Sequence, residues 1–194
     1  MVRAASLSNH PAFAATLLKY IIPVNNSEDR CLTSDLVING ETIHWALVAD
    51  GHGGKDAATL VCETFLLRVS QTATAASKPA LHAAVVNAFH AMHDEVTATC
   101  GFSGTTLTVV AFNSARGELQ SWNVGDSLAI LVHDDGYEVL SKSFRLADNP
   151  EEQERVIALG AKLGRALSES GVAGGPLRAW PGGLAGMLDP SSPS

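Results

Sequence analysis

Apolar and polar residues alternate over the first strongly patterned stretch of the chain, and this period of two predicts β-strands. Residues 31–38 and 43–49 follow it, with Asn39 and Gly40 between them. Asparagine and glycine both tolerate the positive φ angles of a two-residue hairpin turn. We therefore predict that the two strands pair antiparallel.

The pattern then changes to a helical period. In residues 56–70 and 80–97, large apolar side chains recur three and four positions apart, which predicts two amphipathic helices. The positions expected to face a core are Leu60, Val61, Phe65 and Leu66 in the first segment, and Leu81, Val85, Phe89 and Met92 in the second.

Short β-rich segments return in the middle of the chain. Turn-forming residues separate the segments 105–112, 118–124, 127–132 and 137–140. This arrangement predicts an antiparallel meander.

The last part of the sequence begins with a helix signal. Asn149 followed by Pro150 and two glutamates is typical of a helix start, and Gly160 should end that helix. From residue 164 onward the chain is rich in Gly, Ser, Pro and Ala, which predicts an unstructured tail. Strands and helices that occur in blocks predict an α+β fold, with helices packed outside antiparallel sheets.

Composition and charge exclude several classes of function. The 194 residues carry 13 Lys and Arg against 20 Asp and Glu, a net charge of -7, with no basic run to bind nucleic acid or an anionic membrane. No apolar stretch is long enough to cross a bilayer. Three widely spaced cysteines suit a reducing compartment, so we expect a soluble cytoplasmic or nuclear protein. Residues 1–27 contain no acid, which is also typical of an organellar transit peptide.

A candidate cation site begins where the second predicted strand ends. Asp50 follows that strand and precedes residues 51–54 (GHGG), so a carboxylate stands beside backbone that a ligand can approach closely. The hairpin should bring Glu28 and Asp29 next to it. Mg²⁺ and Mn²⁺ prefer such oxygen ligands. The alternative interpretations are a plain Asp-Gly turn and two surface acids.

Six segments, in order along the chain, resemble the protein phosphatase 2C (PPM-type) family. They are residues 27–30 (SEDR), 48–54 (VADGHGG), 103–106 (SGTT), 122–127 (WNVGDS), 149–156 (NPEEQERV) and 175–185 (GPLRAWPGGLA). The resemblance implies a four-layer αββα sandwich and the activity of a metal-dependent protein serine/threonine phosphatase. Its implied domains are an N-terminal extension over 1–20, a partial phosphatase domain over 21–185 and a divergent unstructured tail over 186–194.

The same resemblance implies a metal-binding role for five residues. Asp50 would bridge two cations, Mg²⁺ or Mn²⁺, and the Gly51 carbonyl would bind one of them. Glu28 and Asp29 would contact the metals through water. Asp126 would serve a third, weaker metal position.

His52 and the pair of His90 and His93 need separate interpretation. By the same resemblance, His52 would protonate the serine or threonine oxygen of a phosphorylated protein substrate as this oxygen leaves the phosphorus. His90 and His93, with Asp94 and Glu95 beside them, lack a further ligand motif. A solvated helix face is the better interpretation of that second group.

The sequence also departs from the family pattern. Val24 stands where the family usually has a phosphate-clamping arginine, which implies weaker phosphate binding. Leu128 and Phe144 replace other family residues and suggest structural changes only. After Ala185 two further aspartate motifs are missing, so we expect a C-terminally truncated chain with impaired activity. The alternatives are a non-catalytic module that binds phosphoproteins and an inactive fragment of a gene model.

Overall fold

The described part of the protein comprises residues 28–167, 173–180 and 188–189 of a computed structural model. These residues belong to two compact units, the first ending at Lys142 and the second beginning at Ser143. No helix within these ranges is both long enough and apolar enough to span a bilayer.

The N-terminal hairpin forms as the alternating pattern predicts. β1 (Arg30–Ile38) and β2 (Glu41–Ala49) pair antiparallel along their whole lengths. Asn39 and Gly40 form the turn with φ angles of 50° and 81°. These left-handed values are the ones that an Asn-Gly pair adopts at little steric cost.

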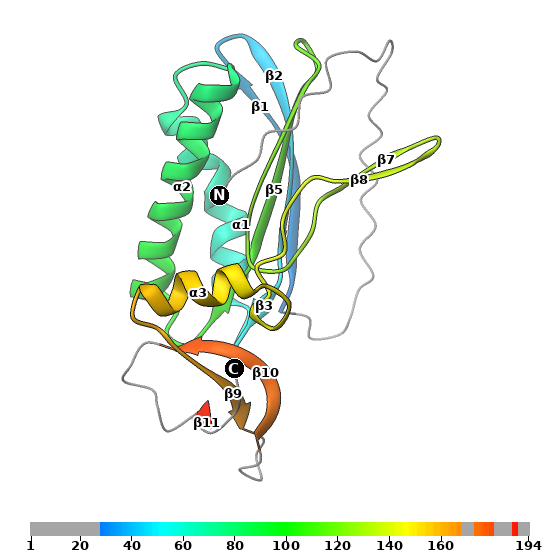
Figure 1. Cartoon of the computed structure of the whole chain (residues 1–194). Coiled ribbons are helices and arrows are strands. Elements are labelled where there is room, and N and C mark those ends of the chain that lie inside the picture. The colour runs from blue at the N-terminus through cyan, green and yellow to red at the C-terminus, as the bar shows by residue number, and fades with distance from the viewer. Residues whose placement is uncertain (1–27, 168–172, 181–187, 190–194) are drawn as a thin grey trace. The chain divides into compact units, whose positions relative to one another are not determined.

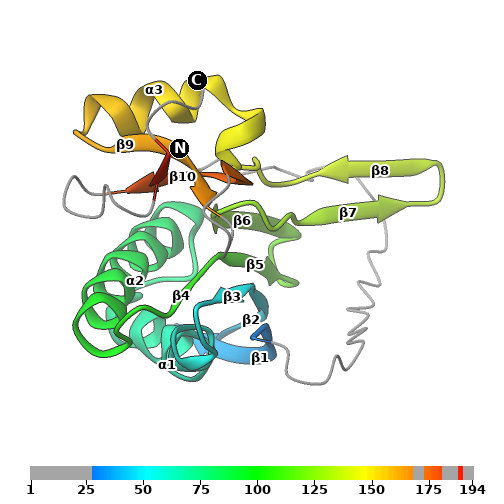
Figure 2. The ribbon, with the colours of Figure 1, turned by 90° about the horizontal axis from the view of Figure 1, so that it is seen from below.

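β2 is also the centre of a larger sheet. It pairs with β5 (Leu107–Asn113), which pairs with β6 (Glu118–Val124), so the strand order is β1-β2-β5-β6. α1 (Asp56–Thr72) and α2 (Lys78–Thr99) lie side by side over one face of this sheet (Figure 1). Both predicted helices are therefore confirmed. Figure 2 shows the same two helices beside the sheet, seen from below.

The main core fills the space between this sheet face and the two helices. Trp45 of β2 and Trp122 of β6 stack there, with ring centroids 6.3 Å apart. Leu60 and Phe89 are half-buried at the edge of the core, while the other helix positions predicted to face it are buried. The sheet contributes these buried side chains: Ile38, Ile43, Trp45, Leu47, Ala49, Leu107, Val109, Ala111 and Trp122.

The predicted meander is wrong in one connection. β7 (Ile130–His133) and β8 (Gly136–Val139) form their own two-stranded sheet, and in the described residues β7 does not pair with β6. The reason is a small second core on the opposite face of the sheet, where Ala129 and Leu140 pack with Leu119 of β6. Burying these side chains carries the chain across the sheet face instead of back along β6.

The second unit corrects the prediction of an unstructured tail. After η1 (Leu146–Asp148) and α3 (Pro150–Ala158), the segments β9 (Lys162–Leu167), β10 (Ala173–Trp180) and β11 (Leu188–Asp189) form an antiparallel sheet of order β10-β9-β11.

The glycines and proline that suggested disorder coincide with an irregularity in this sheet. The register between β10 and β9 shifts between Ala173 and Leu177, where residues 174–176 (GGP) lie. A bulge tolerates residues that a regular ladder excludes, so the Gly-Pro composition did not prevent pairing.

The helix start predicted at Asn149 is confirmed. The Asn149 side chain accepts a hydrogen bond of 3.1 Å from the Glu152 amide, and Pro150 occupies the first helical position. Gly160 follows the helix with a φ of 88°. Helices packed on antiparallel sheets confirm the α+β class. The predicted extension over 1–20, Val24, and most of the predicted tail over 186–194 lie outside the described residues.

Candidate metal centre

Aspartates from three separate segments come close together beyond the end of β2. Asp50 follows β2 and Asp29 precedes β1. The register that pairs Arg30 with Ala49 therefore brings Asp29 next to Asp50. The carboxyl groups of Asp29 and of Asp126, two residues after β6, lie close enough to Asp50 for their charges to act on it. Glycines and exposed side chains surround these acids, so they remain open to solvent.

The acids perturb one another electrostatically. Desolvation raises the pKa of the Asp50 carboxyl, and the charges of Asp29 and Asp126 raise it further. His52 acts on the pKa of Asp50 in the opposite direction. Carboxylates that repel each other in this way favour a bound cation, which compensates their charge.

Glu28 reaches the same region but points to the glycine-rich turn. Its Oε1 atom accepts a hydrogen bond of 2.6 Å from the Gly54 amide. The backbone of Glu28 also packs against Gly51, where an added Cβ would lie 2.5 Å from the Glu28 carbonyl oxygen. Only glycine fits there without a shift of the backbone. Glu28 therefore holds the turn with one carboxylate oxygen and leaves the other available.

His52 lies exposed at the edge of this cluster. It belongs to β3 (Gly51–His52), which pairs with β4 (Gly104–Thr105). The imidazole covers Gly104 so closely that an added Cβ on that glycine would lie 2.5 Å from Nε2. The absence of a side chain at Gly104 thus makes room for the His52 ring.

Hydroxyl residues support the Asp50 backbone from the opposite strand. The Asp50 amide donates to Thr106 Oγ1 at 3.1 Å, and the Asp50 carbonyl accepts from the Thr106 amide at 2.9 Å and from Thr105 Oγ1 at 3.1 Å. Thr106 Oγ1 also lies 2.9 Å from Ser127 Oγ, beside Asp126. The Thr105 and Thr106 hydroxyls belong to residues 103–106, a segment that the family resemblance included without a role for its side chains. That resemblance was the available signal.

The donor set fits a small, hard cation. Within the described ranges, no three His, Cys, Asp or Glu side chains are arranged so that they alone would enclose an ion. Mg²⁺ does not need such a cage, because it keeps several waters and is usually held by one or two carboxylates. The neighbouring carboxyl groups of Asp29 and Asp50 provide that kind of anchor.

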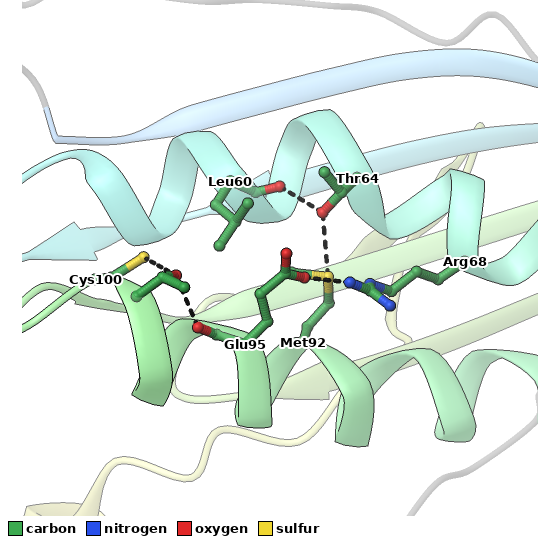
Figure 3. A network of polar contacts seen from close by, with 7 residues as sticks. Leu60, Thr64, Arg68, Met92, Glu95 and Cys100 are labelled. Carbon is green, nitrogen blue, oxygen red and sulfur yellow. Dashed lines mark hydrogen bonds and ion pairs between the residues drawn. The ribbon is translucent and has the colours of Figure 1, made fainter.

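The second group of histidines is placed differently. His90 and His93 are exposed on α2, and Glu95 forms an ion pair with Arg68 of α1 (Figure 3). Thr64 of α1 donates to the Met92 sulfur at 3.2 Å in the same network. Glu95 thus joins the two helices.

Two of the positions that depart from the family pattern, Leu128 and Phe144, lie within the described residues. Leu128 is 49% exposed. Phe144 is half-buried in the second unit.

Comparisons with known proteins agree on one family. A family model for protein phosphatase 2C matches residues 24–174. Probable protein phosphatase 2C 15 from Arabidopsis thaliana is 40% identical over 143 residues, which are 71% of this chain and 32% of that protein. Probable protein phosphatase 2C 3 from Oryza sativa subsp. japonica is 37% identical over 143 residues, 71% of this chain and 29% of that protein. The chain spans about a third of the length of the curated relatives it matches.

Solved structures show the same fold at low sequence identity. A C. elegans sex determining protein has a TM-score of 0.63 and 18% identity, over 92% of this chain and 40% of that one. Serine-threonine phosphatase 2C from Toxoplasma gondii has a TM-score of 0.59 and 17% identity, over 88% of this chain and 63% of that one.

Proposed function

We propose that this chain, which belongs to the protein phosphatase 2C family, uses its carboxylate cluster for metal-dependent hydrolysis of phosphoserine and phosphothreonine in proteins. The observation that carries the proposal is the convergence beyond the end of β2 of Asp29 and Asp50, which the β1–β2 register brings together, with the charge of Asp126 close by. A cation that compensates these charges would favour the ionised form of the cluster.

The residues of the cluster would divide the work of holding Mg²⁺ or Mn²⁺. Asp50 and the Gly51 carbonyl would be direct ligands, and Glu28 and Asp29 would act through water. Asp126 would serve a third, weaker position. When bound, such cations supply the positive charge that activates a water near neutral pH and neutralises the phosphoryl oxygens.

His52 is the residue of this chain that would move a proton. Its ring is exposed at the edge of the cluster and is held over Gly104, so a substrate can reach it from solvent. Cleavage of the phosphorus–oxygen bond leaves a serine or threonine oxygen that needs a proton. Histidine commonly supplies a proton to a leaving group near neutral pH.

The cluster can be tested by hydrolysis of a phosphothreonine peptide by the purified chain with Mn²⁺. We expect turnover that depends on Mn²⁺, and a loss of roughly 100-fold or more in Asp50→Asn, because this change removes a ligand oxygen and its charge. The matched control is Asp135→Asn, an exposed aspartate in the turn between β7 and β8, which should leave the rate unchanged.

Two outcomes would contradict the proposal. Equal rates in Asp50→Asn and in the unchanged protein would remove Asp50 from the chemistry. Binding of the phosphopeptide without any turnover would favour the alternative of a non-catalytic binding module.

A further inference from the structure

We propose that Ser103 is a positioning residue for the carboxylate cluster, because its hydroxyl fastens the turn of residues 51–54 to the start of α1. The inference rests on the proposed function, since the turn matters through the cation that Asp50 and Gly51 would hold. The Ser103 hydroxyl bonds to Gly54 and Ala57. It would act through the turn that connects Asp50 and Gly51 to α1.

The contacts of Ser103 use both hydrogen-bonding capacities of its hydroxyl. Ser103 Oγ donates to the Gly54 carbonyl at 2.8 Å and accepts from the Ala57 amide at 3.1 Å. The side chain is buried, with 7% of the residue exposed. Water therefore has little access to replace either bond.

The first of these bonds completes the attachment of Gly54. The Gly54 amide already donates to Glu28 Oε1, so Ser103 and Glu28 together hold both peptide groups of one glycine. Gly53 and Gly54 have φ angles of 68° and 118°. Glycine can adopt many other backbone conformations, so these two residues need outside contacts to stay in the observed ones. Two opposed hydrogen bonds restrict the turn to one of those conformations.

The second bond supplies a helix cap from a distant part of the chain. Lys55, at the cap position of α1, makes no side-chain hydrogen bond to the helix. The first amides of a helix have no partner within it, and Ala57 is fully buried, so its amide needs an acceptor from elsewhere. Ser103 provides that acceptor from 46 residues away. The turn is thus tied to a rigid element.

The test compares Ser103→Ala with Ser103→Thr, which keeps the hydroxyl. Mn²⁺ binding is followed by the paramagnetic broadening of the amide signals of residues 51–54, and the attachment itself by hydrogen exchange at Ala57. We expect Ser103→Ala to weaken Mn²⁺ binding about 10- to 100-fold, as loss of an outer contact typically does, and to speed exchange at Ala57. Ser103→Thr should recover most of the affinity.

A control separates positioning from general destabilisation. Leu81→Ala removes a buried side chain of α2 and lowers stability without touching the turn. Its Mn²⁺ affinity should stay within about twofold of the unchanged protein, because distant sites act independently. If Ser103→Ala does not fold, Ser103→Cys offers the same comparison, since a thiol of similar size is a weak hydrogen-bonding group.

The outcomes separate this inference from the proposed function. Unchanged Mn²⁺ affinity in Ser103→Ala, or an equal loss in Leu81→Ala, would overturn the role of Ser103 and leave the proposed function intact. The absence of Mn²⁺ broadening in the unchanged protein would instead refute the metal site itself, and the positioning role with it.

Discussion

Gly51 offers the sharpest test of how the carboxylate cluster is built. The residue follows Asp50 directly, and its missing side chain lets the backbone of Glu28, just before β1, approach closely. In Gly51→Ala, the added Cβ would lie 2.5 Å from the Glu28 carbonyl oxygen and 3.1 Å from both the carbonyl carbon and the Glu28 Cβ. Two of these three atoms are backbone, so no flexible side chain can move out of the way.

The size of the effect follows from this geometry. Real Cβ atoms essentially never approach another atom below 3.0 Å, so the two backbones must separate by about 0.5 Å or more. Overpacking of this kind typically costs about 1 to 3 kcal/mol of unfolding free energy. Because the shift separates Glu28 from Asp50, we also expect Mn²⁺ affinity to fall roughly 10-fold or more.

Urea unfolding measures the first effect, and Mn²⁺ broadening of backbone amide signals measures the second. Gly174→Ala in β10 is the matched control, because an added Cβ there meets no atom within 4 Å. That variant should change stability by no more than about 0.5 kcal/mol. If Gly51→Ala kept both its stability and its Mn²⁺ affinity, the close packing of Gly51 on Glu28 could not be what shapes the cluster.

Three further predictions concern other polar groups. Asn149→Ala should cost the second unit about 1 kcal/mol or more, because it removes both the cap of α3 and the hydrogen bond from Asn149 Nδ2 to the Ser143 carbonyl. Asn149→Ser, which keeps a capping oxygen, should lose less in thermal unfolding, and equal losses would contradict a capping role. Arg116, with help from Asn113, lowers the pKa of Glu41 to about 2, so Glu41 stabilises the fold above its ordinary pKa of 4.5 and loses that contribution as pH falls towards 2. Unfolding curves of Glu41→Gln should lack this part of the pH dependence. Asp50→Asn should raise the melting temperature of the metal-free protein at pH 7, because the raised pKa of Asp50 means that its ionised form is disfavoured by folding; a lower melting temperature would contradict this sign.

Much of the first unit could be predicted because its signals are local. The Asn39-Gly40 turn lies between two alternating segments, and the register of that hairpin is enough to bring Asp29 beside Asp50. The helical periods of α1 and α2 are equally local. Asp126 is different, because nothing near it in the sequence indicates that it approaches Asp50, and only the resemblance to a family suggested it.

The features that the sequence does not reveal depend on contacts between distant residues. β9 and β10 pair despite the Gly-Gly-Pro run of residues 174–176, because a bulge accommodates residues that composition alone assigns to loops. The role of Ser103 is hidden for a related reason. Its partners Gly54 and Ala57 lie more than 40 residues away in the sequence, so neither spacing nor periodicity reveals the contact.

The way in which the acidic cluster is supported explains why a cation should also strengthen the fold. A shift of the backbone could relieve the repulsion among neighbouring carboxylates. However, the Asp50 amide and the Asp50 carbonyl are both hydrogen-bonded to Thr105 or Thr106, which holds the backbone in place. Thr106 is in turn bonded to Ser127, next to Asp126, so the segments that carry Asp50 and Asp126 are joined directly. The charges are therefore held together by their backbones, and a cation is the effective means of compensating them. Because an ion that binds the folded chain and not the unfolded one shifts the folding equilibrium, Mn²⁺ should raise the stability of the first unit in proportion to the logarithm of its concentration once it exceeds the dissociation constant.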